Sequence, residues 1–188
     1  MNRKEQLTRA VTVLAARSQA RTQAQQRPKS DPTRLTDSTF YVNVRVDGLA
    51  GTTQLIDSNT KRLVGVTNFD GDTLKSGRDL VIDSVRTIFT DVGTKVEDAS
   101  WFAPKAVVAE LAGAEIRMKQ NNEVLIDLPI SDTQGFKDED FRAISTTPLL
   151  KALETFSLEL EIPKGVTVPA GAPLFLKIAI RCIQAKKN

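Results

Sequence analysis

The chain has 188 residues, a length that suits one folded domain with an appendage. It carries 26 basic and 23 acidic side chains, no histidine and a single cysteine, Cys182. The lack of histidine removes the commonest general base and the commonest metal ligand, and a single cysteine excludes a disulfide framework and a cysteine-rich zinc site. Since no run of eighteen apolar residues occurs, the sequence also argues against a membrane-spanning helix.

The positive charge of the chain is concentrated near its N-terminus. Residues 1–36 contain eight basic side chains against Glu5 and Asp31, a net charge of +6. The remaining 152 residues carry 18 basic and 21 acidic side chains, a net charge of −3. Such an asymmetry points to a polyanion, an anionic membrane or the acidic face of another subunit as a partner.

The first element along the chain is predicted to be a helix from about Lys4 to Gln25. Leu7, Val11 and Leu14 recur at i, i+4 and i+7 and make one apolar stripe, and the surrounding alanines favour helix. The two prolines within residues 28–32 should end this helix, because proline removes a backbone donor and disfavours helix in the residue before it.

We place a boundary near Leu35, between a basic, partly helical arm over residues 1–35 and a folded body over residues 36–188. The apolar stripe of Leu7, Val11 and Leu14 is expected to dock the arm on a neighbouring subunit. The arm cations are expected to bind nucleic-acid phosphates or an acidic partner surface. These cations are Arg9, Arg17, Arg21, Arg27, Lys29 and Arg34. The alternative is a helix that packs on its own body and leaves a solvated basic side.

Beyond the arm the apolar period changes from about four to two, which indicates strands. Residues 39–46 alternate cleanly, residues 79–92 make a long strand, and Asn121-Asn122 should join a hairpin because asparagine tolerates positive φ. The polar segment 57–60 is expected to turn another hairpin, and a short helix is expected within residues 135–145. About eight or nine strands spaced by turns predict an all-β fold, an antiparallel β-sandwich.

Candidates for chemistry are few. Asp70 and Asp72 have the short carboxylate spacing of a calcium loop, although the twelve-residue ligand pattern is absent and the same residues suit a plain turn. Cys182 lies within an apolar strand and is predicted to be a buried structural cysteine, since a reactive thiolate needs an exposed electropositive setting. Trp101 and Phe102 are expected to cover the core, and the alternative is that they form an exposed anchor.

Two segments resemble strands of the single jelly-roll coat proteins of viruses. The C-terminal stretch IPKGVTVPAGAPLFLKIAIRCIQ, residues 162–184, is similar to the closing strands of such a sandwich. The stretch LKSGRDLVIDSVRTIF, residues 74–89, is similar in style to a coat-protein opening strand, with a turn glycine before alternating apolar residues. The resemblance implies a shell subunit or a minor virion component, in particular of a bacterial virus.

The sequence therefore predicts a structural assembly protein rather than an enzyme, with no catalytic residue, no cofactor and no metal. By the resemblance, it would assemble in the host cytoplasm into a virion, associating with itself and with other virion proteins. Its arm would contact nucleic acid, an anionic membrane or a neighbouring subunit. The first alternative is a non-specific nucleic-acid-binding protein that acts through the arm. The second is a carboxylate-based enzyme on a β scaffold, with Asp70, Asp72, Glu97 and Asp98 as its candidate residues.

Overall fold

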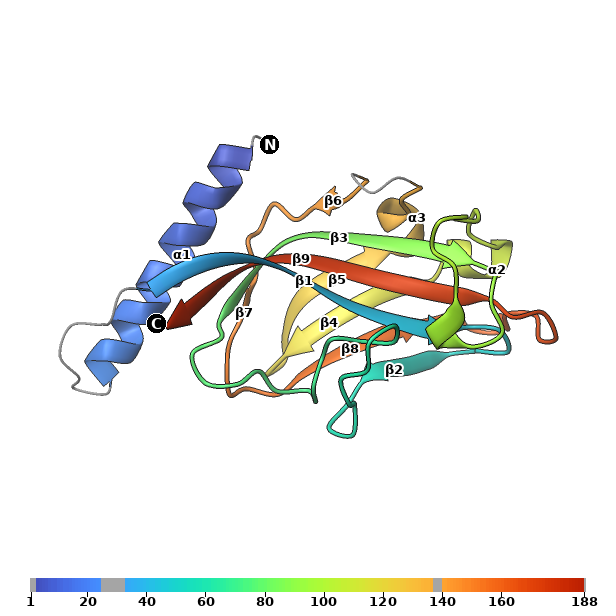
Figure 1. The fold of residues 1–188 in the computed structure, drawn as a ribbon, viewed down its shortest axis with the longest axis horizontal. Coiled ribbons are helices and arrows are strands. Elements are labelled where there is room, and N and C mark those ends of the chain that lie inside the picture. The colour runs from blue at the N-terminus through green and yellow to red at the C-terminus, as the bar shows by residue number, and fades with distance from the viewer. Residues whose placement is uncertain (1–2, 25–32, 137–139, 188) are drawn as a thin grey trace.

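The body of the protein is an antiparallel β-sandwich with a helix packed against one end (Figure 1). The structure is a computed structural model that describes residues 3–24, 33–136 and 140–187. Side chains are described for residues 4–20, 35–136 and 140–184. The prediction of an all-β sandwich with an N-terminal helix is confirmed.

The strands form two sheets. The five-stranded sheet has the order β1 (Thr33–Arg45), β9 (Phe175–Lys187), β3 (Leu80–Thr90), β6 (Arg142–Ala143), and β7 (Leu149–Leu150) also pairs with β3. The four-stranded sheet has the order β2 (Thr52–Ile56), β8 (Phe156–Glu161), β4 (Glu115–Gln120), β5 (Glu123–Pro129). The helical elements are α1 (Arg3–Ala24), α2 (Ala109–Ala112), α3 (Ile130–Thr133) and the 3₁₀ turn η1 (Val96–Asp98).

The strand pairs are nested along the chain. The first strand pairs with the last, β2 pairs with β8, β3 pairs with β6 and β7, and β4 pairs with β5. The chain thus forms one long antiparallel hairpin that is folded over, so that most successive strands lie in opposite sheets. Additional pairing of β9 with β3 and of β8 with β4 completes each sheet. Because these pairs join distant parts of the chain, each sheet requires nearly the whole body to fold together.

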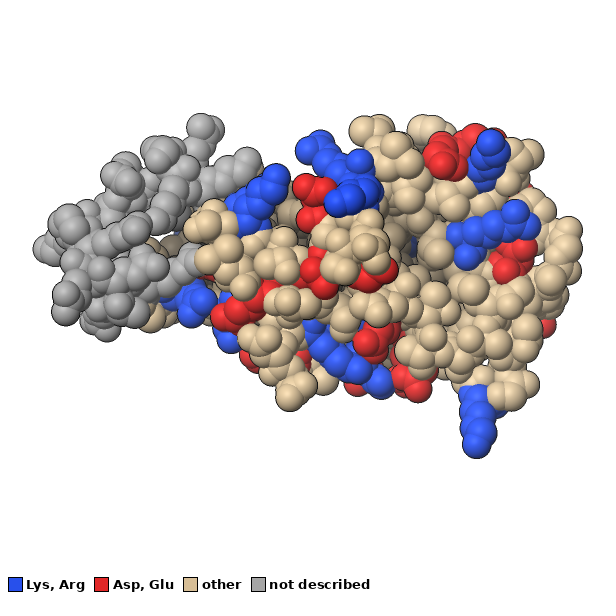
Figure 2. Space-filling view, turned by 90° about the horizontal axis from the view of Figure 1, so that it is seen from below, with Lys and Arg blue, Asp and Glu red and all other residues tan. Residues whose placement is uncertain are grey.

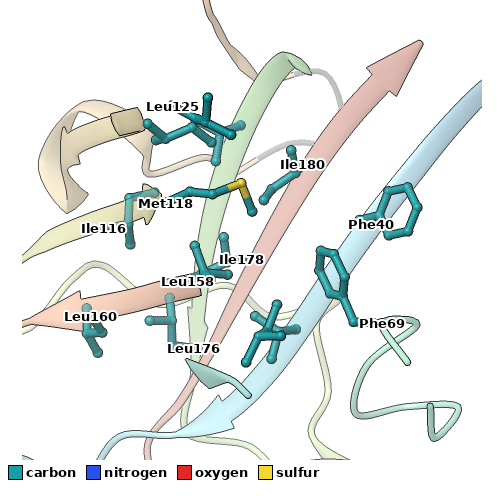
Figure 3. Close-up of a cluster of buried hydrophobic side chains, with 14 of the residues drawn as sticks. Phe40, Phe69, Ile116, Met118, Leu125, Leu158, Leu160, Leu176, Ile178 and Ile180 are labelled. Atoms are coloured by element: carbon teal, nitrogen blue, oxygen red, sulfur yellow. The ribbon is translucent and has the colours of Figure 1, made fainter. Parts of the chain in front are cut away.

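The core lies between the two sheets (Figure 3). Strands β4 and β8 alternate buried and half-buried residues, as the period of two predicts. Their inward side chains meet those of β9 across the sandwich. The central residues of this contact are Ile116, Met118, Leu158, Leu160, Leu176, Ile178 and Ile180. Phe69 extends the core to one side, with its ring centroid 4.9 Å from that of Phe40.

Strand β3 is buried along its whole length, on both faces. Its inward residues belong to the core. On its outward side, helix α1 covers Val81 and the ring of Phe141 lies over Arg86. At the far end, Lys105 in the loop after β3 donates a backbone hydrogen bond to Phe89 and so pairs with the edge of β3. The five-stranded sheet therefore has a partial third layer on its outer side.

The predicted hairpin at the two asparagines is confirmed. Asn121 and Asn122 have φ angles of 47° and 64°, so both adopt the left-handed conformation between β4 and β5. This pattern at both central residues is the one that a type I′ turn requires, and its twist matches that of the flanking strands.

The hairpin predicted around residues 57–60 is wrong. A turn does follow β2, but residues 61–67 do not pair with it, because β2 pairs with β8 instead. The segment folds against the open edge of β1, where Asn43 donates its backbone N–H to the carbonyl of Val66.

The short helix expected within residues 135–145 is also misplaced. The described residues of this segment are not helical, and the helical turn in the region is α3, directly after β5. Gly135 donates its backbone N–H to the carbonyl of Thr87, and β6 pairs with β3 further along. Hydrogen bonding to the edge of β3 therefore overrides the local preference for a helix.

The core assignment makes a direct prediction about stability. Leu158 is fully buried in the centre of the four-stranded sheet, whereas Leu63 is half exposed on a loop. We expect Leu158→Ala to lower the free energy of unfolding by about 2–5 kcal/mol, and Leu63→Ala to change it by less than about 0.5 kcal/mol. Denaturant unfolding of the two variants measures the difference, and equal effects would contradict the sandwich packing.

Candidate functional site

Helix α1 lies across the outer side of the five-stranded sheet, near the end where β9 finishes (Figure 1). Ala10 and Leu14 are buried in a small cluster with Val81 of β3 and Ile183 of β9. The half-buried Val13 packs against the same cluster. The predicted helix is thus confirmed, and it is docked on its own body.

The apolar stripe of the helix is split between the body and the surface. Leu14 faces the body together with Ala10, while Leu7 and Val11 remain 42% and 39% exposed. Since Leu14 is occupied within its own chain, the prediction that it docks on a neighbour is corrected. Leu7 and Val11 stay accessible for such a contact.

Arg17, one of the predicted phosphate-binding cations, lies beside two carboxylates of its own body. Its guanidinium lies 3.5 Å from a carboxylate oxygen of Glu154 and 4.0 Å from one of Asp79. The Asp79 carboxylate also accepts a hydrogen bond from the backbone N–H of Ala152, at 2.8 Å. Arg17 therefore fastens the helix to an acidic spot on the body, by attraction that salt would weaken.

The other predicted arm cations fall into two groups. Arg9 is exposed, and its guanidinium donates a long hydrogen bond of 3.5 Å to the carbonyl of Ser145. The remaining cations, or their side chains, lie outside the described residues: Arg21, Arg27, Lys29 and Arg34. Arg9 is therefore the one predicted cation that is seen both exposed and without an acidic partner among the described residues.

A pocket of about 510 Å³ opens beside the helix, between α1 and strands β1, β9, β3 and β6. A β-bulge between Ile82 and Ser84 shifts the alternation of β3, so that Asp83 and Ser84 both line this pocket. Its other lining residues are Gln6, Asp37, Ser38, Thr39, Phe141, Ala143, Arg181 and Cys182. The lining is largely polar and contains charges of both signs.

The polar groups of the pocket are held by interactions within the chain. The ring of Phe141 lies 3.8 Å from the Arg181 guanidinium and 4.7 Å from that of Arg86, so one aromatic ring contacts two cations. The hydroxyl of Ser84 donates a hydrogen bond to Asp83 at 3.1 Å. Burial, with a smaller contribution from the Asp83 charge, raises the pKa of the Cys182 thiol. Cys182 is thus the buried structural cysteine that its apolar strand predicts.

Three of the four carboxylates nominated for an enzyme are engaged in their own loops. Asp70 lies 3.8 Å from the Lys75 ammonium. Asp72 accepts a hydrogen bond from Thr73. Asp98 accepts backbone hydrogen bonds from residues 94 and 95, which lower its pKa.

The fourth carboxylate, Glu97, is exposed. Within the part of the chain that the structure describes, no three acidic, cysteine or histidine side chains gather as metal ligands. The calcium alternative at Asp70 and Asp72 thus gains no further ligand.

The pair Trp101-Phe102 behaves differently from the predicted core cover. Trp101 is half-buried, and the Lys177 ammonium lies 5.6 Å from its ring and 5.4 Å from that of Tyr41. Phe102 is fully exposed, at 101% of the reference area. The prediction is therefore wrong for Phe102, because the loop turns it away from the body.

Sequence reasoning missed the acidic partners of the arm and the cation pair around Phe141. Asp79 and Glu154 are far from Arg17 along the chain, and no local pattern marks them as neighbours. One signal for the docked helix is the run Leu80-Val81-Ile82 at the start of β3, where consecutive apolar residues place an apolar side chain on each face.

No protein-family model, curated protein or solved structure matches this chain. Among the described residues, no helix is long and apolar enough to cross a membrane.

The docking of α1 predicts different roles for two leucines of the same helix. Leu14→Ala should lower the free energy of unfolding by about 2 kcal/mol and speed amide hydrogen exchange in α1, because it opens a space against Val81. Leu7→Ala is the matched control and should change neither the free energy of unfolding nor the exchange rate of α1 by much. Equal exchange rates in the two variants would show that the helix is not seated through Leu14.

The buried thiol predicts a pH dependence of stability. The pKa of Cys182 is raised in the folded protein, whereas the unfolded thiol ionises near pH 8.5. Above about pH 8.5 the folded state therefore keeps the thiol proton that the unfolded state releases. The free energy of unfolding consequently falls as the pH rises above about 8.5. We expect the free energy of unfolding of Cys182→Ala to fall less between about pH 8 and about pH 10 than that of the wild type. Rapid labelling of the native thiol would contradict this.

Proposed function

We propose that the protein is a structural subunit that assembles with copies of itself, as the coat protein or another virion subunit of a virus does. In this proposal the β-sandwich is the building unit, and the basic arm contacts nucleic acid or a neighbouring subunit. The nested strand pairing is the observation that carries the proposal. It supports a single jelly roll, in which two Greek keys interleave in two sheets.

Other functions built on the same architecture fit the residues less well. Jelly rolls also occur in lectins and cupins. The chain has no histidine, the ligand on which imidazole-rich metal sites depend, and its single tryptophan packs against Lys177. A coat subunit needs neither a metal site nor an aromatic platform, because it needs surfaces that fit other copies.

The distribution of charge also supports the proposal, because the body has a surface of mixed charge while the arm carries the positive excess. On the outer face of the four-stranded sheet, Arg117 is hydrogen-bonded to Glu115, Asp127 and Glu161. In the view of Figure 2, basic and acidic side chains are interspersed, and neither sign forms a large patch. The strong positive excess belongs to the arm, which is the part suited to a polyanion.

The structure determines how the arm should be altered in a test. Removing residues 1–35 would delete the start of β1 and uncover Val81 and Ile183. Substitution of charges avoids this damage. The arm variant is Arg9→Gln, Arg27→Gln, Lys29→Gln, and its control with the same change of charge is Lys75→Gln, Arg78→Gln, Lys164→Gln, all exposed on the body.

We expect the wild type and both variants to form the same oligomers, measured by light scattering at low and high salt. The arm variant should bind DNA more weakly, and its affinity should fall less steeply with salt, by about 0.9 in the logarithmic slope for each phosphate that the arm no longer neutralises. A wild-type protein that stays monomeric at every concentration and salt would overturn the assembly proposal. Salt-dependent DNA binding by that monomer would instead favour a nucleic-acid-binding protein.

A further inference from the structure

The first and last strands of the chain form a two-stranded ribbon at one end of the five-stranded sheet. Strands β1 and β9 pair without a register shift as far as Thr33, which lies opposite Lys187. Strand β3 accompanies β9 only as far as Gln184, which pairs with Leu80. Within the described residues, the last three residues of β9 therefore pair with β1 alone. Here the two strands extend past β3 by about 10 Å.

The register of this ribbon brings cations from both ends of the chain together. Arg34 of the arm lies directly opposite Lys186, and Lys187 is the next residue of β9. Residues directly opposite each other in an antiparallel pair have Cα atoms about 4.5–5.5 Å apart. The ribbon past β3, residues 33–35 and 185–187, thus contains three basic residues and no acidic one.

The opposition of two cations sets this ribbon apart from the rest of the body. In the four-stranded sheet, Arg117 lies opposite Asp127 on one side and opposite Glu159 on the other. Like charges directly opposite each other destabilise a strand pair, whereas opposite charges stabilise it. The register pair of Arg34 and Lys186 therefore carries a cost that an anion bound beside it would remove.

The three cations belong to both faces of the ribbon. Successive residues of a strand lie on opposite faces, so Lys186 and Lys187 do not share a face. Lys187 belongs to the face of Ile183, on which α1 packs through Ala10 and Leu14. In Figure 1 the end of β9, marked C, accordingly lies beside α1. The C-terminal lysines therefore adjoin the basic arm.

We propose that Lys186 and Lys187 join Arg34 in binding the phosphates of double-stranded DNA. This inference rests on the nucleic-acid contact of the function proposed above and adds the C-terminus of the chain to it. The major groove of DNA admits a two-stranded ribbon and has a phosphate backbone on each side, so it meets cations on both faces. A flat anionic surface, of a protein or a membrane, meets one face only. Because phosphates carry no sequence information, the binding should not depend on DNA sequence.

A variant of the full chain, Lys186→Gln with Lys187→Gln, tests the contact. Its control is Lys61→Gln with Arg62→Gln, which removes two adjacent exposed cations of the body and changes the net charge equally. The C-terminal variant should be at least as stable to denaturant as the control, because it relieves the repulsion of like charges. A clear loss of stability in the C-terminal variant alone would show that the lysines hold the ribbon together, and would overturn the inference.

We expect the C-terminal variant to bind duplex DNA of arbitrary sequence more weakly than the control and the wild type. The logarithmic slope of affinity against salt should be smaller by about 1.8, since each lost phosphate contact removes about 0.9. Equal affinities and slopes for the variant and the control would overturn the inference. Binding to vesicles that contain anionic lipid, without binding to DNA, would overturn it in favour of a membrane surface.

The same samples separate this inference from the proposed function. Light scattering should show the same oligomers for the wild type, the variant and the control, because the lysines are assigned to DNA. Assembly without any effect of the variant on DNA binding would leave the proposed function standing and overturn the inference. A wild type that stays monomeric, with the expected loss of DNA binding in the variant, would contradict assembly and support the phosphate contact.

Discussion

The pairing of the last strand between the first and the third holds this structure together. Strand β9 bonds to β1 along its full length on one side and to β3 on the other. Its inward face supplies Leu176, Ile178 and Ile180 to the core. Its outward face supplies Ile183 to the seat of the helix, and the cations that stack on Phe141 and on Trp101. Without β9, neither the five-stranded sheet nor the covering of its outer side would form.

This arrangement connects the arm to the turn between β4 and β5. The helix is seated by few apolar side chains, and Arg17 ties it to Asp79 and Glu154. Glu154 also accepts the hydrogen bond from Asn121 that fixes the turn between β4 and β5. One carboxylate therefore takes part both in holding the arm and in holding this turn.

Local patterns in the sequence are sufficient for the elements whose partners are near in the chain. The helix of the arm, the alternation in β4 and β8 and the asparagine turn between β4 and β5 all follow from spacing and backbone preference. Pairing over long distances is not visible in these patterns, because periodicity says nothing about which strand lies beside which. For this reason the sequence predicts a hairpin after β2, although that segment packs on the edge of β1.

The residues of the candidate site show the same limit, because local sequence patterns do not reveal contacts between distant parts of the chain. Leu7, Val11 and Leu14 are equivalent in the sequence pattern, and only the seat on Val81 and Ile183 distinguishes Leu14. Likewise, Arg17 has the same sequence context as other arm cations until Asp79 and Glu154 are brought to it by the fold. The exposure of Phe102 follows from the path of a loop and has no signature in composition.

The central claim is that this sandwich is a building unit for a larger assembly. Electron microscopy of the purified full-length protein over a range of concentrations tests it most directly. The account predicts regular rings, filaments or closed shells in which every copy repeats the same contact with its neighbour. Fields without any regular particle, at every concentration and salt, would contradict it.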